Sequence, residues 1–175
     1  MQSSAIWITG LPASGKTTIA GLLQSHLKSK NIPVMILDGD ELRKTLSSDC
    51  DYTEQGRKEH NRRVIEVAKL LVKNGITTII PLISPYQETR ERARKEIPNF
   101  VEVYVKASLD TYIKRDPKGL YKKAQAGEIK NMTGLQSPYE EPTNPEVILD
   151  TEKFAPQECL HTIIENLEEL GYLKD

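Results

Sequence analysis

Apolar and polar residues follow two alternating patterns along the chain. Short, nearly continuous apolar runs are followed by longer stretches in which apolar residues recur at helical spacing. The first pattern is typical of strands covered on both faces, and the second of amphipathic helices. Their alternation predicts repeated β-α-β units around a mostly parallel sheet. The predicted strands cover residues 5–9, 34–37, 77–83, 100–105 and 147–149.

The predicted helices fill most of the chain between these strands. The helix over residues 53–73 is the clearest, because Val64, Val67 and Leu71 fall on one face. Ser108 is expected to cap a later helix through its hydroxyl group. The other predicted helices cover residues 16–30, 86–95, 108–115, 120–126 and 155–170.

Residues 116–143 depart from this pattern. The segment is rich in Lys, Gly, Pro and Tyr, and it has no strong periodicity outside residues 120–126. A stretch of this length without a core pattern is usually functional or disordered. No internal repeat or second domain is visible, so residues 1–175 are expected to form a single α/β domain with five strands.

Composition restricts the function classes. Hydrophobic residues make up 38% and charged residues 28% of the 175 positions, which is enough for a folded core. The formal net charge of −1 gives no broad attraction for nucleic acid or an anionic membrane. Cys50 and Cys159 do not make a disulfide framework, and neither a signal peptide nor a membrane span is recognisable. A cytoplasmic protein that binds neither nucleic acid nor membrane is therefore expected.

The candidate chemistry begins at residues 10–17, which read Gly-Leu-Pro-Ala-Ser-Gly-Lys-Thr. This octapeptide matches the phosphate-binding pattern G-x-x-x-x-G-K-[ST] between a predicted strand and a predicted helix. Glycines let the backbone approach phosphate oxygens, and successive N–H groups with the helix N-terminus attract an anion. In such loops the lysine reaches the β- and γ-phosphates of ATP, and the threonine ligates Mg²⁺. The predicted nucleotide-binding residues are Gly10, Leu11, Pro12, Ala13, Ser14, Gly15, Lys16 and Thr17, of which Thr17 also binds the metal and Lys16 is also catalytic.

Carboxylates after the second strand favour a small-molecule kinase over other P-loop proteins. A GTPase needs a guanine-reading Asn-Lys-x-Asp, which the sequence lacks, and the third strand does not end in the aspartate expected of motor ATPases. Asp38 and Asp40 follow the second strand instead. A carboxylate there can orient Mg²⁺ or accept the proton of the acceptor hydroxyl, so Asp38 is a predicted catalytic and metal-binding residue. The alternative is a β-turn followed by an N-cap at Asp40.

Residues 116–143 are a candidate mobile lid within a three-layer P-loop NTPase fold. Phosphoryl transfer to an acceptor other than water requires that water be excluded, and a closing segment achieves this. The alternative for the segment is an ordinary solvated basic loop. The basic residues that can reach phosphates from the segment and its flank are Arg115, Lys118, Lys122, Lys123 and Lys130.

Arg90, Arg92 and Arg94 alternate with glutamates on the predicted helix of residues 86–95. This charge pattern predicts an exposed helix face.

Several stretches resemble the adenosine 5′-phosphosulfate kinase family, and the resemblance covers nearly the whole chain. The most specific is Asp-Pro-Lys-Gly-Leu-Tyr-Lys-Lys-Ala-Gln-Ala-Gly-Glu-Ile-Lys at residues 116–130, followed by Thr-Gly at 133–134 and Ser-Pro-Tyr-Glu at 137–140. Trp-Ile-Thr-Gly-Leu at residues 7–11 and Ile-Ser-Pro at 83–85 add to it. The resemblance implies that ATP phosphorylates the 3′-hydroxyl of adenosine 5′-phosphosulfate (APS) in sulfate activation. It also implies a homodimer and a functional coupling to an ATP sulfurylase.

The resemblance further implies a set of residues that hold the sulfonucleotide. Arginine suits a phosphosulfate, because its fork donates two hydrogen bonds to one oxyanion group. By spacing, Arg43 lies one turn after Asp40, and Arg57 shares a helix face with His60. The implied residues are Asp40, Arg43, Arg57, Ile83, Ser84, Lys118 and Met132, to which Tyr52 and His60 are added by position.

Three of these positions depart from the family pattern. Where the family usually stacks the substrate adenine between two phenylalanines, this chain has Tyr52 and Met132. Tyr52 can still stack, and Met132 offers a polarizable thioether. His60 stands where the family usually has asparagine, and its donor pattern changes with pH. These departures bear on affinity and pH dependence more than on the type of reaction.

Ser84 is the third predicted catalytic residue, beside Lys16 and Asp38. The resemblance assigns it as a phosphoserine intermediate, but the sequence gives it no obvious general base. A P-loop kinase can transfer directly to an acceptor held in line, so contact with the substrate is favoured over a covalent role. Two broader alternatives stay open: a kinase for another acceptor, and a nucleotide-gated binding module without turnover.

Overall fold

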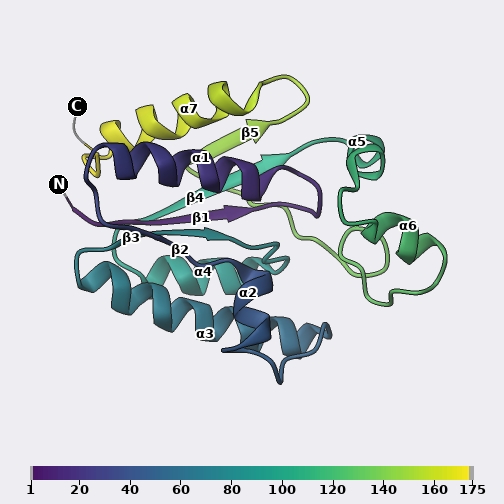
Figure 1. Ribbon diagram of the computed structural model, residues 1–175. Coiled ribbons are helices and arrows are strands. Elements are labelled where there is room, and N and C mark those ends of the chain that lie inside the picture. Colours follow the sequence, from purple (N-terminus) through teal and green to yellow (C-terminus); the bar gives the residue numbers. More distant parts are fainter. Residues whose placement is uncertain (1, 174–175) are drawn as a thin grey trace.

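The structure is a computed structural model that describes residues 2–173, with a five-stranded sheet between two layers of helices (Figure 1). The strand order is β2-β3-β1-β4-β5, and all neighbouring strands are parallel. The carboxyl ends of the strands therefore lie at one edge of the sheet. The predicted three-layer α/β class is confirmed. The strands are β1 (Ala5–Thr9), β2 (Val34–Ile36), β3 (Thr77–Pro81), β4 (Phe100–Lys106) and β5 (Val147–Asp150).

Two pairs of helices cover the sheet: α1 (Lys16–Ser29) with α7 (Pro156–Glu169) on one face, and α3 (Glu54–Lys73) with α4 (Gln87–Glu96) on the other (Figure 1). Side chains of β1 alternate between two apolar clusters. Ile6 and Ile8 belong to the cluster with residues of α1 and α7, whereas Trp7 belongs to the one with residues of α3 and α4. Every residue of β1 is buried, so this strand is the centre of the core.

The boundaries of the predicted strands and helices are confirmed to within two residues. The largest difference at a strand is in β3, which ends at Pro81 rather than at residue 83. The chain leaves the sheet there and turns at Ser84, whose φ of 47° lies in the left-handed region. Over residues 2–173, no helix combines the length and apolarity that crossing a membrane requires.

A short helix, α2 (Gly39–Lys44), has no counterpart in the sequence prediction. Its N-cap is Asp38, whose Oδ1 accepts hydrogen bonds from the backbone N–H groups of Asp40 at 2.9 Å and Glu41 at 3.1 Å. The alternative of an N-cap at Asp40 is therefore wrong. The helix is too short for hydrophobic periodicity to show it in the sequence.

Residues 116–143 contain part of a small apolar core. They include α6 (Leu120–Gln125) and follow α5 (Leu109–Arg115), which Ser108 caps as predicted. The sequence pattern does not indicate this core, because aromatic residues supply much of its surface. Its buried residues are Tyr112, Tyr121, Ala124 and Met132.

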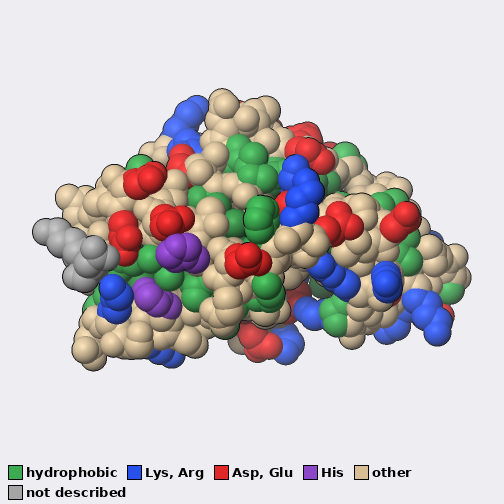
Figure 2. Space-filling model, turned by 90° about the horizontal axis from the view of Figure 1, so that it is seen from above, with side chains coloured by type: hydrophobic (Ala, Val, Ile, Leu, Met, Phe, Trp, Pro, Cys, Tyr) green, Lys and Arg blue, Asp and Glu red, His purple; other side chains and the backbone are tan. Residues whose placement is uncertain are grey.

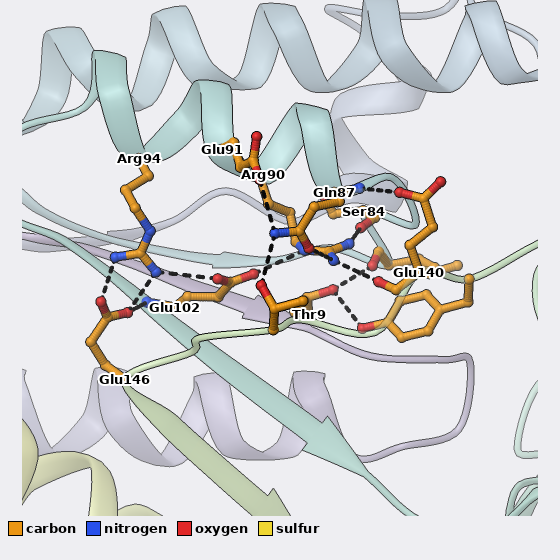
Figure 3. A network of polar contacts seen from close by, with 12 residues as sticks. Thr9, Ser84, Gln87, Arg90, Glu91, Arg94, Glu102, Glu140 and Glu146 are labelled. Atoms are coloured by element: carbon orange, nitrogen blue, oxygen red, sulfur yellow. Dashed lines mark hydrogen bonds and ion pairs between the residues drawn. The ribbon is translucent and has the colours of Figure 1, made fainter.

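The arginines of α4 correct one prediction. Arg90 is 1% exposed and Arg94 is partly buried, so of the three only Arg92 is exposed as expected. Residues four positions apart lie on the same side of a helix, and here that side faces Glu102 of β4 (Figure 3). Burial is tolerated because Glu102 and Glu146 supply the opposite charges.

Candidate active site

A cavity of about 1200 Å³ lies at the carboxyl ends of the strands, where ligands bind in open α/β sheets. Its walls come from the P-loop and the start of α1, from α2 and α3, and from residues 81–85 at the end of β3. Residues around 115–120 and the loop after β5 complete it. Figure 2 shows several Lys and Arg side chains, with some Asp and Glu, on the lobe of α5 and α6. Basic residues also line the cavity from the P-loop, α2 and α3 (Lys16, Arg43 and Arg57).

The P-loop, residues 10–17, turns tightly between β1 and α1. The backbone at Gly10 leaves no room for a side chain, because a Cβ atom there would lie 2.3 Å from the carbonyl oxygen of Val105. Oγ1 of Thr151 donates a hydrogen bond of 3.1 Å to the Ser14 carbonyl, which ties the loop to the end of β5. The start of α1 lines the cavity. A helix N-terminus after such a loop is a ready site for phosphate.

Lys16 is bound to its own loop. Its Nζ donates hydrogen bonds to the carbonyl oxygens of Gly10 at 2.9 Å and Leu11 at 2.8 Å. Burial, followed by the positive charge of Lys118, lowers the pKa of Lys16 to about 7. A polyanion in the cavity would favour the charged form of the lysine. Ligand binding and protonation of Lys16 are therefore coupled.

Thr17 and Asp38 both line the cavity. Asp38 is held in orientation by its capping bonds to α2. Within residues 2–173, no three His, Cys, Asp or Glu side chains are grouped so as to hold a metal by themselves. Mg²⁺ in nucleotide sites takes only one or two protein ligands beside phosphates and water. A hydroxyl and a carboxylate fit an Mg²⁺ ion that enters with ATP.

Two arginines lie close to the exposed ring of Tyr52. Cζ of Arg43 lies 4.5 Å and Cζ of Arg57 lies 5.5 Å from the ring centroid, within the range of cation–π contacts. Arg43 donates to the Cys50 carbonyl at 3.0 Å. Arg57 donates to the carbonyls of Tyr52 at 3.0 Å and Asn131 at 2.8 Å, and burial lowers its pKa. Both arginines line the cavity, with some of their donors already holding the backbone.

His60 is a polar group without a partner in the cavity wall. It is 3% exposed, and neither ring nitrogen has a hydrogen-bond partner among the described residues. Burial, and after it the charges of Arg43 and Arg63, lower the pKa of His60 to about 4. The imidazole is therefore neutral near pH 7. A buried polar group without a partner is costly, so His60 is placed to meet a ligand.

Ser84 also lines the cavity and is 2% exposed. Its hydroxyl oxygen accepts a hydrogen bond of 3.2 Å from Nδ2 of Asn61. Sequence reasoning does not single out Asn61, because an asparagine inside a helix carries no motif. Ile83, the neighbouring predicted residue, also lines the cavity. The structure thus brings the predicted acceptor residues of α3 and of the β3 loop together.

On the lid side of the cavity, the predicted residues Lys118 and Asp40 are present, but the predicted residue Met132 is not. Nζ of Lys118 lies 2.5 Å from Oδ2 of Asp40, which joins the lid to α2 by an exposed ion pair. Met132 does not line the cavity, because its side chain is buried in the core around Tyr121. Phe154, which no motif marks, does line it. Among the predicted P-loop residues, those outside the lining are Gly10, Leu11 and Ser14.

Comparison with known proteins agrees with this geometry. A family described as adenylylsulphate kinase matches residues 2–150. The chain is 50% identical over 173 residues to a probable adenylyl-sulfate kinase of Pyrococcus abyssi, covering 99% of each. It is also 44% identical to a probable bifunctional SAT/APS kinase 2 of Sorangium cellulosum, covering 99% of this chain and 30% of that one. The structure of the Mycobacterium tuberculosis APS kinase CysC in complex with AMPPNP and APS superposes with a TM-score of 0.91 at 40% identity, covering 95% of this chain and 98% of that chain. The chain therefore belongs to the adenylylsulphate kinase family.

Proposed function

We propose that the protein transfers the γ-phosphoryl group of ATP to the 3′-hydroxyl of APS, giving 3′-phosphoadenosine 5′-phosphosulfate. One observation carries the proposal: a single cavity is lined both by the P-loop around Lys16 and by the acceptor residues around Ser84. The family relatives and the similar structure in complex with AMPPNP and APS support it. Donor and acceptor in one cavity can be held for direct transfer.

The nucleotide half of the cavity holds and polarises ATP. The P-loop amides and the N-terminus of α1 bind the phosphates, and the charged form of Lys16 exchanges its bonds to the loop for phosphate oxygens. Thr17 and Asp38 would hold Mg²⁺, which neutralises phosphate charge when it is bound. Asp38 also orients the acceptor hydroxyl or accepts its proton as the new O–P bond forms.

The acceptor half orients APS. Arg43 and Arg57 bind the phosphosulfate, because their charges are close to the cavity and already fixed by backbone carbonyls. Tyr52 stacks on the adenine, with 56% of its surface exposed for this contact. Neutral His60 gives the hydrogen bonds that the usual asparagine would give. Asp40, Ile83 and Lys118 complete the site, and Met132 would reach it only after a movement of the lid.

Ser84 contacts the acceptor rather than carrying the phosphoryl group. Among residues 2–173, its hydroxyl is hydrogen-bonded to the amide of Asn61 and to no carboxylate or imidazole, which supports direct transfer. Trapping a phosphoenzyme from labelled ATP that disappears in Ser84→Ala would contradict this role.

The same proposal includes closure of residues 116–143 over the phosphates, a homodimer, and action in the cytoplasm. It also includes functional coupling to an ATP sulfurylase, which the bifunctional SAT/APS kinase relative supports.

A coupled assay tests the function. ADP release is measured with ATP and Mg²⁺ while the acceptor is varied among APS, a nucleoside and a sugar acid, and the product is identified by mass. Release that depends on APS and yields the 3′-phosphorylated product is expected. Release stimulated by another acceptor would assign a different kinase, and release that no acceptor stimulates would favour a binding module.

A further inference from the structure

The loop that carries Ser84 is held from two sides by buried side chains (Figure 3). On one side, Oγ1 of Thr9 donates a hydrogen bond of 2.6 Å to the carbonyl of Ile83. On the other, Nη1 of Arg90 donates one of 2.6 Å to the carbonyl of Ser84. A left-handed φ of 47° is unfavourable for serine. The two bonds stabilise this conformation, and with it the direction of the Ser84 side chain.

The same two side chains hold residues 139–140, where the lid segment rejoins the body. Because the hydroxyl proton of Thr9 is already donated, the Tyr139 hydroxyl donates to Thr9 across 2.9 Å. Nη2 of Arg90 donates to the Glu140 carbonyl at 2.5 Å, and the Glu140 N–H donates to the Pro85 carbonyl at 2.8 Å. Arg90 therefore bridges two backbone carbonyls from segments about 55 residues apart in sequence.

The charge of Arg90 is balanced away from these carbonyls. Its Nε lies 2.9 Å from Oε1 of Glu102 in an ion pair, although the N–H is not aimed at that oxygen. Glu102 also accepts from Arg94 at 3.2 Å, and Arg94 is paired with Glu146 (Figure 3). Since Glu102 faces Nε, both terminal nitrogens of Arg90 are left to bridge the loop and the lid. A lysine has one nitrogen and cannot form this fork.

We propose that Arg90 is a positioning residue for phosphoryl transfer. It does not line the cavity, and it acts by fixing the Ser84 loop against residues 139–140. The inference rests on the proposed function, in which Ser84 contacts the acceptor. A displaced loop should impair the alignment of the acceptor and leave the ATP phosphates, which bind across the cavity, in place.

The test compares Arg90→Lys with Arg92→Lys, the same change on the exposed side of the same helix. Arg90→Lys should lower kcat/KM for APS about tenfold or more, with the KM for ATP changed less than about twofold. Hydrogen–deuterium exchange should rise in residues 83–87 and 137–143 and not in the P-loop. Arg92→Lys should match the wild type in every readout.

Loss of thermal stability with unchanged KM values and unchanged exchange in both segments would overturn the proposal. So would equal rises in the KM values for ATP and APS. Should Arg90→Lys not fold, Arg90→Met with Glu102→Gln removes both buried charges, and wild-type kinetics in that variant would also overturn it. Hydrogen–deuterium exchange can be measured whether or not the protein turns over APS. A wild-type protein inactive with APS therefore contradicts the function alone, and unchanged exchange in the variant contradicts the role of Arg90.

Discussion

The two halves of the cavity are built in different ways. The nucleotide half is built around one continuous stretch, of which Pro12, Ala13, Gly15, Lys16 and Thr17 line the cavity, and its backbone is shaped by a close approach at Gly10. The acceptor half is made of side chains from distant segments, as the contact between Asp40 and Lys118 across 78 positions shows. Where the backbone binds the ligand, only the few residues that set the backbone conformation are essential. Where side chains bind the ligand, a single substitution can change the affinity. The two halves should therefore respond differently to mutation.

Lys16→Ala should have the largest effect. It removes the ammonium group that, in the proposed mechanism, exchanges its bonds to the Gly10 and Leu11 carbonyls for phosphate oxygens, and kcat should fall about 10²–10³-fold. Steady-state kinetics with saturating ATP and APS would measure it. Lys28→Ala, an exposed lysine in the same helix, is the control and should keep full activity. An unchanged kcat in Lys16→Ala would show that Lys16 is not a catalytic residue.

Arg57→Lys should have the second largest effect, and this effect should fall on the acceptor half alone. The guanidinium group joins the carbonyls of Tyr52 and Asn131, and one ammonium group cannot hold both in the same geometry. The KM for APS should rise about 10- to 100-fold with little change for ATP. Arg62→Lys, whose arginine pairs with Glu59 on the same helix, is the matched control. A similar rise for both substrates would mean that Arg57 serves the fold and not the acceptor.

The affinity for ATP should depend on pH through Lys16. In the free protein the pKa of Lys16 is about 7, and bound phosphates raise it, so binding is favoured below pH 7 and weakens as pH rises above it. At pH 8 about 0.9 of a proton should be taken up on binding, and affinity should fall by up to about tenfold per pH unit. Calorimetry in buffers of different ionisation enthalpy measures the uptake. Lys16→Arg stays charged and should take up no proton on binding. Equal proton uptake in that variant would mean that another group titrates.

His60→Leu should have the smallest kinetic effect. It should weaken the binding of APS but make the fold more stable. Removing a buried imidazole without partners should raise the free energy of unfolding by about 1 kcal/mol. Losing its bonds to the ligand should raise the KM for APS about three- to tenfold. Denaturant unfolding and kinetics check the two effects together. A less stable variant with normal KM would show that His60 is a packing residue.

The sequence predicts the fold well, and five of the eight predicted P-loop residues line the cavity, for a physical reason. Strand and helix periods decide which faces are buried, and the octapeptide at residues 10–17 has its own required geometry. The sequence pattern predicts an exposed Arg90, because alternation with glutamates is also typical of a solvated helix face. Its partner Glu102 lies inside a strand that otherwise reads as apolar. Such pairing is a tertiary fact that local patterns do not contain.

The acceptor half shows the same limit. Arg43, Arg57, His60 and Ser84, which family resemblance and helical spacing single out, all line the same cavity. Asn61 beside Ser84 carries no motif. Met132 packs in the lid core with Tyr112 and Tyr121. The sequence pattern does not show that these two tyrosines are buried.

The small core of Tyr112, Tyr121, Ala124 and Met132 has a mechanical consequence. This core joins α6 of the lid to α5, and Leu11 and Ala13 of the P-loop pack against it. An opening movement of the lid must therefore break the buried hydrogen bond from the Tyr121 hydroxyl to the Pro12 carbonyl, as well as the exposed pair of Lys118 and Asp40 and the bond from Arg57 to Asn131. An exposed pair of this kind contributes only about 0–1 kcal/mol. The buried contacts with the P-loop should therefore decide how the lid moves, and salt, which screens only the exposed pair, should change that movement little.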